Sequence, residues 1–286
     1  MDVNEVKKGL FRDSALEKQL LDVGYIVAPF FLESELEEIQ NFYFNIHPDE
    51  KINLQGAMNG IHMTTWSGNY GYKKMVERFL ENSFSKGCAR LLKDHRIFNS
   101  VFIAKEKGNS TQFTLHQDWT VVDESKDYSI NIWVPLKDVD ENNGAVWLIP
   151  NSHKLEQPIR GAGCLHTGYN EQIKELENHL QCVKVKAGEA LIFFHTTVHG
   201  SPANLQEGRR VVACCTAVRK SAELRTFFQP HEDSPLEVYR PEDNFVFEYE
   251  DVMNQAASMA PKGELLEKRS SYKPHEINIK SALAKI

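Results

Sequence analysis

The feature that most limits the fold is a series of short β-favouring segments separated by turn residues. The segments lie between residues 97 and 218 and read IFNSVFIAK, FTLHQDWTVV, SINIWVPL, AVWLIP, QCVKVK, ALIFFHTTVH and RVVACCTAV. Turn signals such as ENNG, PNSH and EGR divide them. Many short strands in succession are typical of a β-sandwich, a jelly roll or a barrel.

Helices are predicted mainly before this β-rich region. Residues 14–23 have amphipathic spacing and end at Gly24, a residue typical of helix C-termini, and the three residues after it favour a strand. Ser34 and Glu37 have the spacing of a capping box, which predicts the start of a second helix. Apolar residues recur at helical spacing over 72–92 and predict a third.

We therefore expect one domain over residues 1–286, because no interdomain linker is visible. Its first part, 1–96, is predicted to be mainly helical, and 97–218 to form the β core. Three glycines interrupt the strand pattern over 155–180, and such long connections are often lids, so we predict a lid-like insertion there. Residues 219–286 are polar and predicted to form a C-terminal surface extension with a short terminal helix.

Composition excludes several classes of protein. Hydrophobic residues make up 41% and charged residues 26%, which suits a folded globular chain. The net charge is −7 and the basic residues are scattered, so we expect no nucleic-acid partner. No 18-residue apolar run occurs and the first residues do not resemble a signal peptide, so we expect no membrane partner. Five cysteines, an odd number, argue against a disulfide framework, and we expect a cytoplasmic protein.

The first candidate metal ligands are His116 and Asp118, in the segment LHQDW. They lie two residues apart in a β-favouring run, so both side chains would point to the same face of a strand. Two such groups can hold one metal ion. The alternative is a polar strand edge, so a metal site needs a third ligand from elsewhere in the chain.

A third ligand is available at the end of the segment LIFFHTTVHGS. His199 follows an aromatic and β-branched run and precedes a glycine turn. Two imidazoles and a carboxylate form the facial triad of iron(II) oxygenases. His195 and His199 also have the spacing of a zinc-binding HxxxH pair, but the run favours a strand and no Glu follows His195. We interpret His195 as a neighbour of the site or a packing residue.

One arginine has the spacing to bind an anion beside the metal. Arg210 comes eleven residues after His199, and a hairpin over residues 201–208 would return it to the metal-bearing strand. Its guanidinium fork suits a carboxylate. Arg209 would face the opposite side of the same strand, as a solvated surface residue.

Together these segments resemble the phytanoyl-CoA dioxygenase family of iron and 2-oxoglutarate oxygenases. The resemblance rests on HQDW, NIWVPLKDVDENNGAVWLIPNSHK and FFHTTVHGSPANLQEGRR, which follow the order of the family over about residues 97–218. It implies a mainly β, double-stranded β-helix (a cupin-like jelly roll) with the N-terminal helices packed on the outside. It also implies an enzyme that uses Fe(II), 2-oxoglutarate and O2, and that releases succinate and CO2.

The resemblance further implies roles for individual residues. Three would bind iron: His116, Asp118 and His199. Four would contact 2-oxoglutarate: Arg210 at its distal carboxylate, and Gln117, Trp133 and Ser201 beside it. Halogenating relatives have Gly or Ala in place of Asp118, so the reaction expected is hydroxylation of an unactivated C–H bond in a small molecule, with desaturation or ring closure as alternatives.

Two other functions fit parts of the same pattern. A cupin-like metalloenzyme that does not use 2-oxoglutarate would keep the metal ligands but have no need of Arg210. A non-catalytic β-sandwich binding module would need neither. The identity of the substrate and the oligomeric state are left open by these patterns. Four residues are candidates for a substrate pocket, with ordinary core positions as the alternative: Trp66, Tyr70, Trp119 and Asn131.

Overall fold

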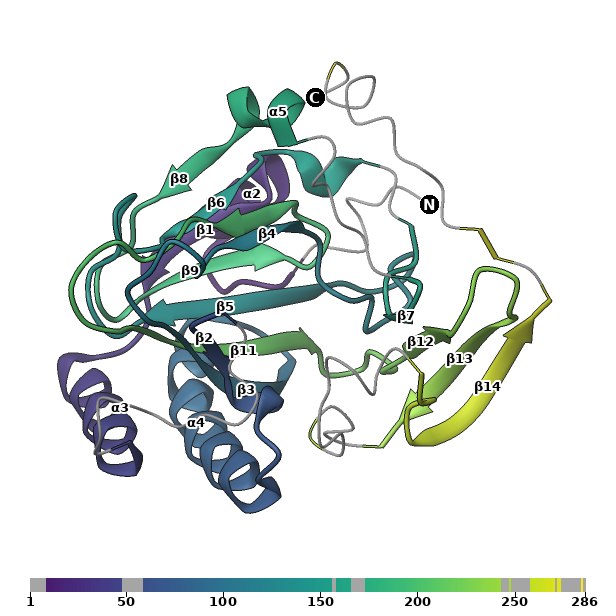
Figure 1. The fold of residues 1–286 in the computed structure, drawn as a ribbon, viewed down its shortest axis with the longest axis horizontal. Coiled ribbons are helices and arrows are strands. Elements are labelled where there is room, and N and C mark those ends of the chain that lie inside the picture. The colour runs from purple at the N-terminus through teal and green to yellow at the C-terminus, as the bar shows by residue number, and fades with distance from the viewer. Residues whose placement is uncertain are drawn as a thin grey trace.

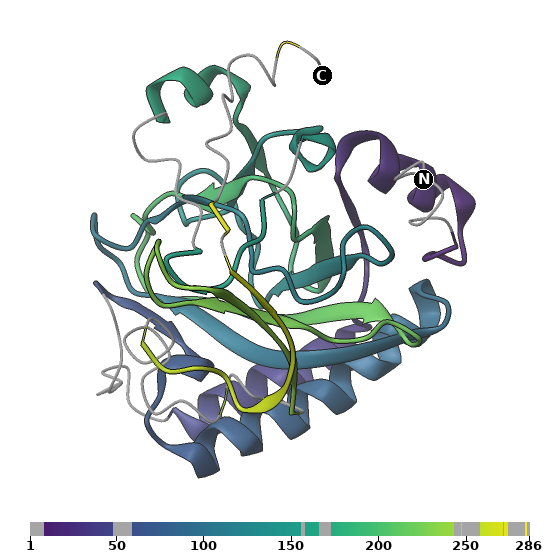
Figure 2. The same cartoon turned by 90° about the vertical axis from the view of Figure 1, so that its right-hand side faces the viewer.

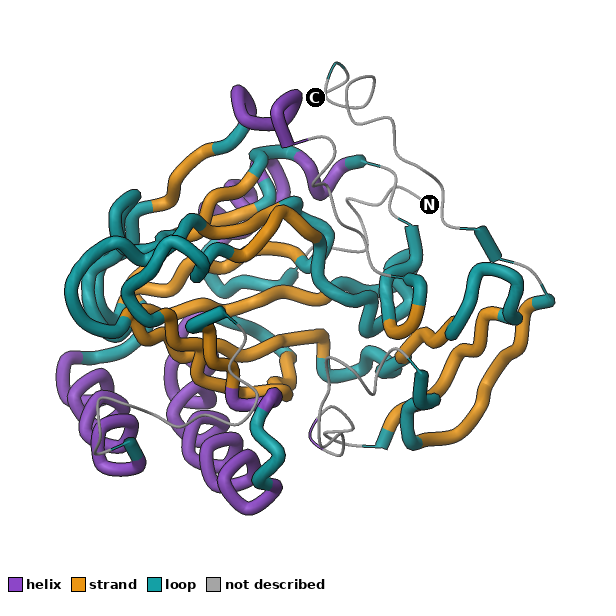
Figure 3. Tube along the Cα trace, in the orientation of Figure 1, coloured by secondary structure: helices purple, strands orange, loops and turns teal. Residues whose placement is uncertain are grey.

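Two antiparallel β-sheets lie one over the other in the centre of the molecule, and two long helices cover the outer side of the larger sheet (Figures 1 and 3). The computed structural model describes residues 9–47, 59–155, 158–165, 173–242, 247, 258–270, 272–273 and 284. A third sheet extends from one end of the sandwich (Figure 1). The mainly β architecture predicted from the sequence is confirmed.

The large sheet has the strand order β1-β9-β5-β11-β3-β2, and every neighbouring pair in it is antiparallel. Its strands are β1 (Tyr25–Pro29), β2 (Ile61–Met63), β3 (His95–Lys105), β5 (Ser129–Pro135), β9 (Glu189–Phe194) and β11 (Arg210–Arg219). The small sheet has the order β4-β10-β6-β8 and is also antiparallel. Its strands are β4 (Phe113–His116), β6 (Val146–Leu148), β8 (Gln181–Val183) and β10 (His199–Ser201). Two strands of the large sheet, β1 and β2, therefore come from the N-terminal part of the chain.

Side chains on the large sheet alternate between two separate cores. On β11, Ala213 and Cys215 pack in the core under the helices, whereas Val212 and Cys214 pack between the two sheets. Arg210 has the same parity as Val212, so its side chain lies between the sheets. This inner face is where a site can be built with side chains from both sheets.

Three helices precede or cover the large sheet (Figure 2). Helix α2 (Ser14–Val23) is capped by the Asp13 side chain, which accepts from the Ala15 N–H at 2.8 Å, and it ends at Gly24 with a positive φ of 91°. Helices α3 (Glu33–Ile46) and α4 (Tyr70–Leu91) pack against the large sheet through apolar residues of the outer core. The three predicted helices are confirmed.

The start of α3 differs from the predicted capping box. The N-cap residue is Leu32, and it is the Glu35 side chain that accepts from the Leu32 N–H at 3.0 Å. Ser34 and Glu37 therefore lie inside the helix. The prediction was wrong because the chain leaves β1 and enters the helix earlier than the capping pattern indicated.

The region after residue 220 forms more regular structure than we predicted. Strands β12 (Thr226–Gln229), β13 (Leu236–Pro241) and β14 (Gly263–Arg269) form the third sheet together with β7 (Ala162–Gly163). Much of the predicted terminal helix lies outside the described residues, as do 156–157 and 166–172 of the predicted lid. The short elements η1 (Thr64–Trp66), η2 (Ser152–Lys154), α5 (Ile173–Leu176) and η4 (Glu177–His179) complete the described structure. Within that structure, no helix has the length and apolar character needed to cross a lipid bilayer.

Candidate metal centre

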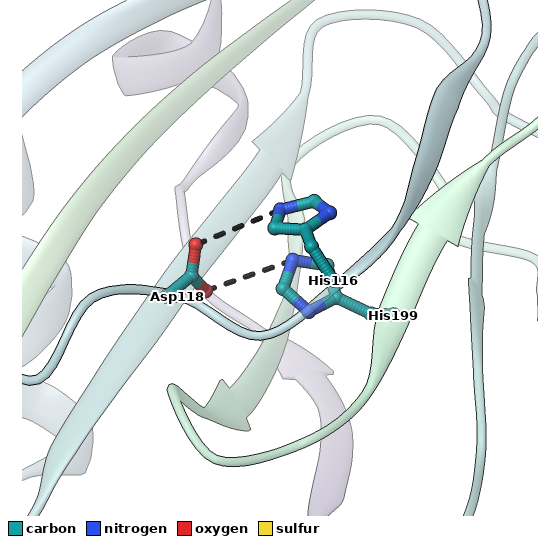
Figure 4. A group of neighbouring side chains, drawn as sticks. All are labelled: His116, Asp118 and His199. Carbon is teal, nitrogen blue, oxygen red and sulfur yellow. Dashed lines mark ion pairs between the residues drawn. The ribbon is translucent and has the colours of Figure 1, made fainter. Parts of the chain in front are cut away.

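The structure brings His116, Asp118 and His199 together on the small sheet (Figure 4). His116 is the last residue of β4 and His199 the first of β10, and the two are direct partners in the antiparallel pairing of these strands. Their ring centroids are 4.4 Å apart. Asp118 lies two residues beyond the end of β4 and turns its carboxylate toward both rings (Figure 4).

Backbone carbonyls set the orientation of both imidazoles. His116 Nδ1 lies 2.8 Å from the Thr114 carbonyl oxygen, and His199 Nδ1 lies 2.9 Å from that of Thr197. A carbonyl can only accept, so each Nδ1 donates and each Nε2 keeps its lone pair. The two Nε2 atoms lie 3.9 Å and 3.6 Å from the oxygens of Asp118, and the three candidate donor atoms all lie within 4.8 Å of one another.

The electrostatics favour the protonation states that a metal needs. Burial of His199 lowers its pKa to about 4, so its imidazole is neutral at pH 7. Burial alone would raise the pKa of Asp118, but its electrostatic interactions with His199, His195 and His116, and with the Arg160 guanidinium, outweigh burial and the pKa falls below its ordinary value. A neutral imidazole and a carboxylate are the forms that bind metal ions. Two imidazoles and one carboxylate suit iron(II), with coordination positions left for other ligands.

A buried polar network supports Asp118 from behind. Asn131 Nδ2 donates to Asp118 Oδ2 at 2.5 Å, and Asn131 Oδ1 lies 3.2 Å from His195 Nε2. Arg160, which is fully buried, donates from Nε to the Asp118 carbonyl at 2.7 Å and pairs with Glu124. His195 is thus a supporting residue and not a fourth member of the cluster. Our sequence analysis missed Arg160, because nothing in its local sequence distinguishes it from an ordinary surface arginine.

The residues predicted to contact 2-oxoglutarate lie on several elements. Arg210 is buried on the inner face of β11, with its guanidinium carbon 5.5 Å from the centre of the Trp133 ring. Ser201 ends β10, and its hydroxyl oxygen lies 2.6 Å from Lys105 Nζ. Gln117 is buried and donates from Nε2 to the Thr196 carbonyl at 2.6 Å, which ties it to the turn that precedes His199.

Three expectations about local structure were wrong. Asp118 follows β4 instead of sharing the strand with His116. The run that leads to His199 is not one strand, because a turn after Phe194 separates β9 in the large sheet from β10 in the small sheet. Arg210 does not return beside β10 in a hairpin, since it starts a strand of the opposite sheet. The start of β11 and the end of β10 are linked through Lys105, which is the register partner of Arg210 and contacts Ser201.

The candidate pocket residues have different surroundings. Tyr70 is 49% exposed at the start of α4, so it is not part of an enclosed site. Trp66 is buried and packs with Phe113 and Trp119 near the metal cluster. Asn131 contacts Asp118 directly, as described above.

Arg209 and Arg210 point to opposite sides of β11, as strand alternation predicted. Arg209 donates from Nε to Glu106 at 2.7 Å and lies near the Tyr43 hydroxyl, on the helix side of the sheet. Arg210 Nε and NH1 are buried without a hydrogen-bond partner among the described residues. Its pKa falls to about 9, and burial is the cause. An unpaired buried guanidinium is costly and is expected where an anion binds.

Comparison with known proteins gives a consistent picture. The family model for phytanoyl-CoA dioxygenase matches residues 23–212. Phytanoyl-CoA dioxygenase 1 from Oryza sativa subsp. japonica is 27% identical over 112 residues, which make up 38% of this chain and 40% of the rice protein. The chain therefore matches about two fifths of the length of that curated relative.

Two solved structures are similar in fold. The epimerase SnoN in complex with Fe3+, α-ketoglutarate and nogalamycin RO has a TM-score of 0.53 and 19% identity, over 74% of this chain and 86% of that one. The non-haem α-ketoglutarate-dependent carbocyclase SnoK from nogalamycin biosynthesis has a TM-score of 0.55 and 18% identity, over 75% of this chain and 86% of that one. These likenesses confirm the predicted double-stranded β-helix.

Proposed function

Because this chain belongs to the phytanoyl-CoA dioxygenase family, we propose that it is an iron(II)- and 2-oxoglutarate-dependent dioxygenase. Its substrate is a small molecule, and the reaction we propose is hydroxylation of an unactivated C–H bond. When bound, the metal with 2-oxoglutarate and O2 supplies the oxidising chemistry, and succinate and CO2 are released. The protein itself binds, orients and shields the reactants.

The observation that carries the proposal is the donor set of His116, Asp118 and His199. Both imidazoles present Nε2 lone pairs that are fixed by backbone hydrogen bonds, and the carboxylate lies within 4 Å of both. Pre-oriented donors of this kind match the two-histidine, one-carboxylate arrangement of non-haem iron oxygenases. We propose that these three residues hold the iron.

The co-substrate is assigned to the inner face of the large sheet. Arg210 is proposed to bind the distal carboxylate of 2-oxoglutarate, because it is a buried cation without an acidic partner among the described residues. Trp133 and Ser201 would contact the co-substrate beside it. Gln117 is also proposed to lie beside 2-oxoglutarate. Its side chain holds the turn before His199 by donating to the Thr196 carbonyl.

The proposal also specifies the type of oxidation and the cellular location of the protein. SnoN is described as an epimerase and SnoK as a carbocyclase, so proteins with this fold also catalyse other outcomes. We favour hydroxylation because Asp118 supplies the third protein ligand in place of the small residue of halogenating relatives. A cytoplasmic location is proposed as well, and the five cysteines, all of them free thiols, fit a reducing compartment.

The test is the conversion of 2-oxoglutarate to succinate by purified protein with iron(II) and ascorbate. Without a second substrate we expect slow succinate release. In a screen of metabolites, the true substrate should make succinate release faster, and mass spectrometry identifies the oxidised product. Asp118→Ala and His199→Ala should abolish both succinate release and metal binding. His231→Ala, a change at an exposed histidine on the third-sheet side, is the matched control.

The outcomes distinguish the alternatives. Metal binding without 2-oxoglutarate binding or succinate would favour a cupin-like metalloenzyme of another class. Binding of neither would favour a non-catalytic β-sandwich module. Full activity of Asp118→Ala and His199→Ala would show that the metal is held elsewhere.

A further inference from the structure

Two buried cations lie directly opposite each other on the inner face of the large sheet. Lys105 ends β3 and Arg210 begins β11, and the two residues are partners in the antiparallel register. Lys105 is 0% exposed and Arg210 is 6% exposed. Both have the strand parity of residues that pack between the sheets, Val101 on β3 and Val212 on β11.

No acidic side chain neutralises this pair within the described structure. The pKa of Lys105 falls to about 6 because of burial and, second, because of the charge of Arg210, and no carboxylate acts on either residue. Like charges on directly opposite strand residues are destabilising, and burial makes the repulsion stronger. Charging both of these buried basic groups together, with no carboxylate beside them among the described residues, is therefore costly, which indicates a site that is completed by an anion.

Among the described residues, the neighbours of Lys105 are uncharged except for Arg210. Lys105 Nζ lies 2.6 Å from Ser201 Oγ, 3.2 Å from the Ser201 carbonyl and 2.7 Å from the Pro202 carbonyl, all at the end of β10. From β4, the Phe113 ring lies 5.4 Å away. From β2, Ile61 is its partner on the other side of the strand. The connection before β6 contributes Gly144, where an added Cβ would lie 3.3 Å from Lys105 Cδ and 3.6 Å from Arg210 NH2.

We propose that Lys105 is a second binding residue for the distal carboxylate of 2-oxoglutarate, and that Lys105 takes up one proton from solvent when this carboxylate binds. This inference rests on the proposed function, which assigns the carboxylate to Arg210. It adds a residue that the sequence analysis did not select, and it makes binding of the co-substrate dependent on pH.

The Ser201 hydroxyl can change its hydrogen-bonding role when Lys105 is protonated. A neutral Lys105 amine can donate to the Ser201 and Pro202 carbonyls and accept from the Ser201 hydroxyl at the 2.6 Å contact, whereas a protonated ammonium donates to all three oxygens. Protonation therefore turns the Ser201 hydroxyl hydrogen away from Lys105 and frees it to donate to the carboxylate. In this step the amine gains one proton from the buffer, the carboxylate stays an anion, and no other bond forms or breaks.

Gly144 lies beside the two basic residues. Its φ is 82°, in the left-handed region, and a Cβ at this position would be tight against the Pro202 carbonyl oxygen at 3.1 Å and Lys105 Cδ at 3.3 Å. The positive φ and these tight contacts explain why a glycine ends the NNG turn at residues 142–144, next to Lys105 and Arg210.

The test is calorimetry of 2-oxoglutarate binding to the manganese-loaded protein without O2, at pH 7.5, in phosphate and in Tris. The dependence of the heat on the ionisation enthalpy of the buffer gives the number of protons taken up. We expect the wild-type protein to take up close to one proton per 2-oxoglutarate bound. We also expect the dissociation constant to fall by up to about tenfold for each pH unit between pH 8.5 and pH 6.5. Protonation of a histidine ligand would act in the opposite direction, because it weakens metal binding.

Variants separate this role from a purely structural one. Lys105→Met should bind 2-oxoglutarate at least about tenfold more weakly and take up no proton, as expected for loss of a buried positive charge beside the carboxylate. Arg209→Gln, on the opposite face of β11 and paired with Glu106, is the control and should match the wild-type protein in both quantities. A third measurement uses 2-oxopentanoate, which has the same chain without the distal carboxylate and should bind without proton uptake.

The failure of this inference differs from the failure of the proposed function. If the wild-type protein binds 2-oxoglutarate without proton uptake, and its affinity does not rise as pH falls, the role of Lys105 is refuted while the enzyme class stands. If the wild-type protein does not bind 2-oxoglutarate, the proposed function fails and this inference with it. The wild-type measurements decide the question even if Lys105→Met does not fold.

Discussion

At the scale of single residues, the contact between Asn131 and Asp118 sets the orientation of a candidate metal ligand. The amide nitrogen donates to the carboxylate at 2.5 Å, while the amide oxygen faces His195 at 3.2 Å and the Thr216 hydroxyl at 3.5 Å. Because these partners lie behind the carboxylate, the amide cannot turn without losing them. Asn131 is therefore a positioning residue for Asp118.

We expect Asn131→Ala to weaken metal binding by about 10- to 100-fold, the range found when outer-shell partners of metal ligands are removed. The cause is freer rotation of the Asp118 carboxylate. The measurement is a titration with cobalt(II), followed by its visible absorption, which reports the ligand geometry as well as the affinity. Thr216→Val removes only two long contacts of the hydroxyl, to Asn131 Oδ1 and to His195 Nε2 at 3.5 Å each, and should have a smaller effect. An unchanged affinity and spectrum in Asn131→Ala would contradict the positioning role.

At the scale of secondary-structure elements, α4 packs on the large sheet through a residue with no side chain. A Cβ at Gly87 would lie 2.5 Å from the ring of Phe30, a buried residue that also contacts Phe84 with ring centroids 5.5 Å apart. Glycine ordinarily weakens a helix interior by about 1 kcal/mol relative to alanine. Here the absence of a side chain lets the aromatic cluster contact the helix.

We expect Gly87→Ala to lower the free energy of unfolding by about 1–3 kcal/mol, since overpacking of a rigid core outweighs the gain in helix propensity. Gly71→Ala is the control on the same helix, because the nearest neighbour of the added Cβ would be the Asn69 side-chain oxygen at 3.4 Å, an ordinary contact distance. That change should leave stability unchanged or raise it slightly. Urea unfolding of both variants is the measurement, and a Gly87→Ala protein more stable than wild type would show that Phe30 does not pack as described.

At the scale of the whole molecule, buried histidines make stability depend on pH. His62 is 2% exposed on β2, neither ring nitrogen has a hydrogen-bond partner among the described residues, and burial is the main cause that lowers its pKa to about 3. The unfolded chain has the ordinary histidine pKa of about 6.5 and binds a proton below it. The contribution of neutral His62 is therefore fully present above about pH 6.5 and is lost as pH falls from there toward 3.

We expect His62→Phe to reduce the loss of stability between pH 7.5 and 5 by about 2 kcal/mol, from roughly 1.4 kcal/mol per pH unit for one proton below pH 6.5. Urea unfolding of metal-free protein at the two pH values is the measurement. Burial also lowers the pKa of His47, so part of the pH dependence should remain in the variant. An identical difference between the two pH values in wild type and variant would show that His62 does not titrate on unfolding.

The sequence alone determined the properties that depend on residue type and short spacing. Strand alternation predicted that Arg210 and Arg209 face opposite sides, and the structure places them so because a β-strand has a period of two. The helix over 14–23 was predicted to the residue, since Gly24 supplies a local end signal. The three candidate metal ligands were identified because their chemistry is uncommon in such a combination.

Only the tertiary structure decided which segments meet. His116 and His199 are neighbours because β4 and β10 pair although 82 residues lie between the two histidines in the chain. Lys105 and Arg210 are neighbours because β3 and β11 pair in one register. Local sequence carries no signal for such pairings, whose register depends on contacts with the rest of the sheet. For the same reason Lys105 and Arg160 resemble ordinary residues in the sequence, and Asn131 could be named only as a pocket candidate; their contacts become evident only where distant segments bury them together.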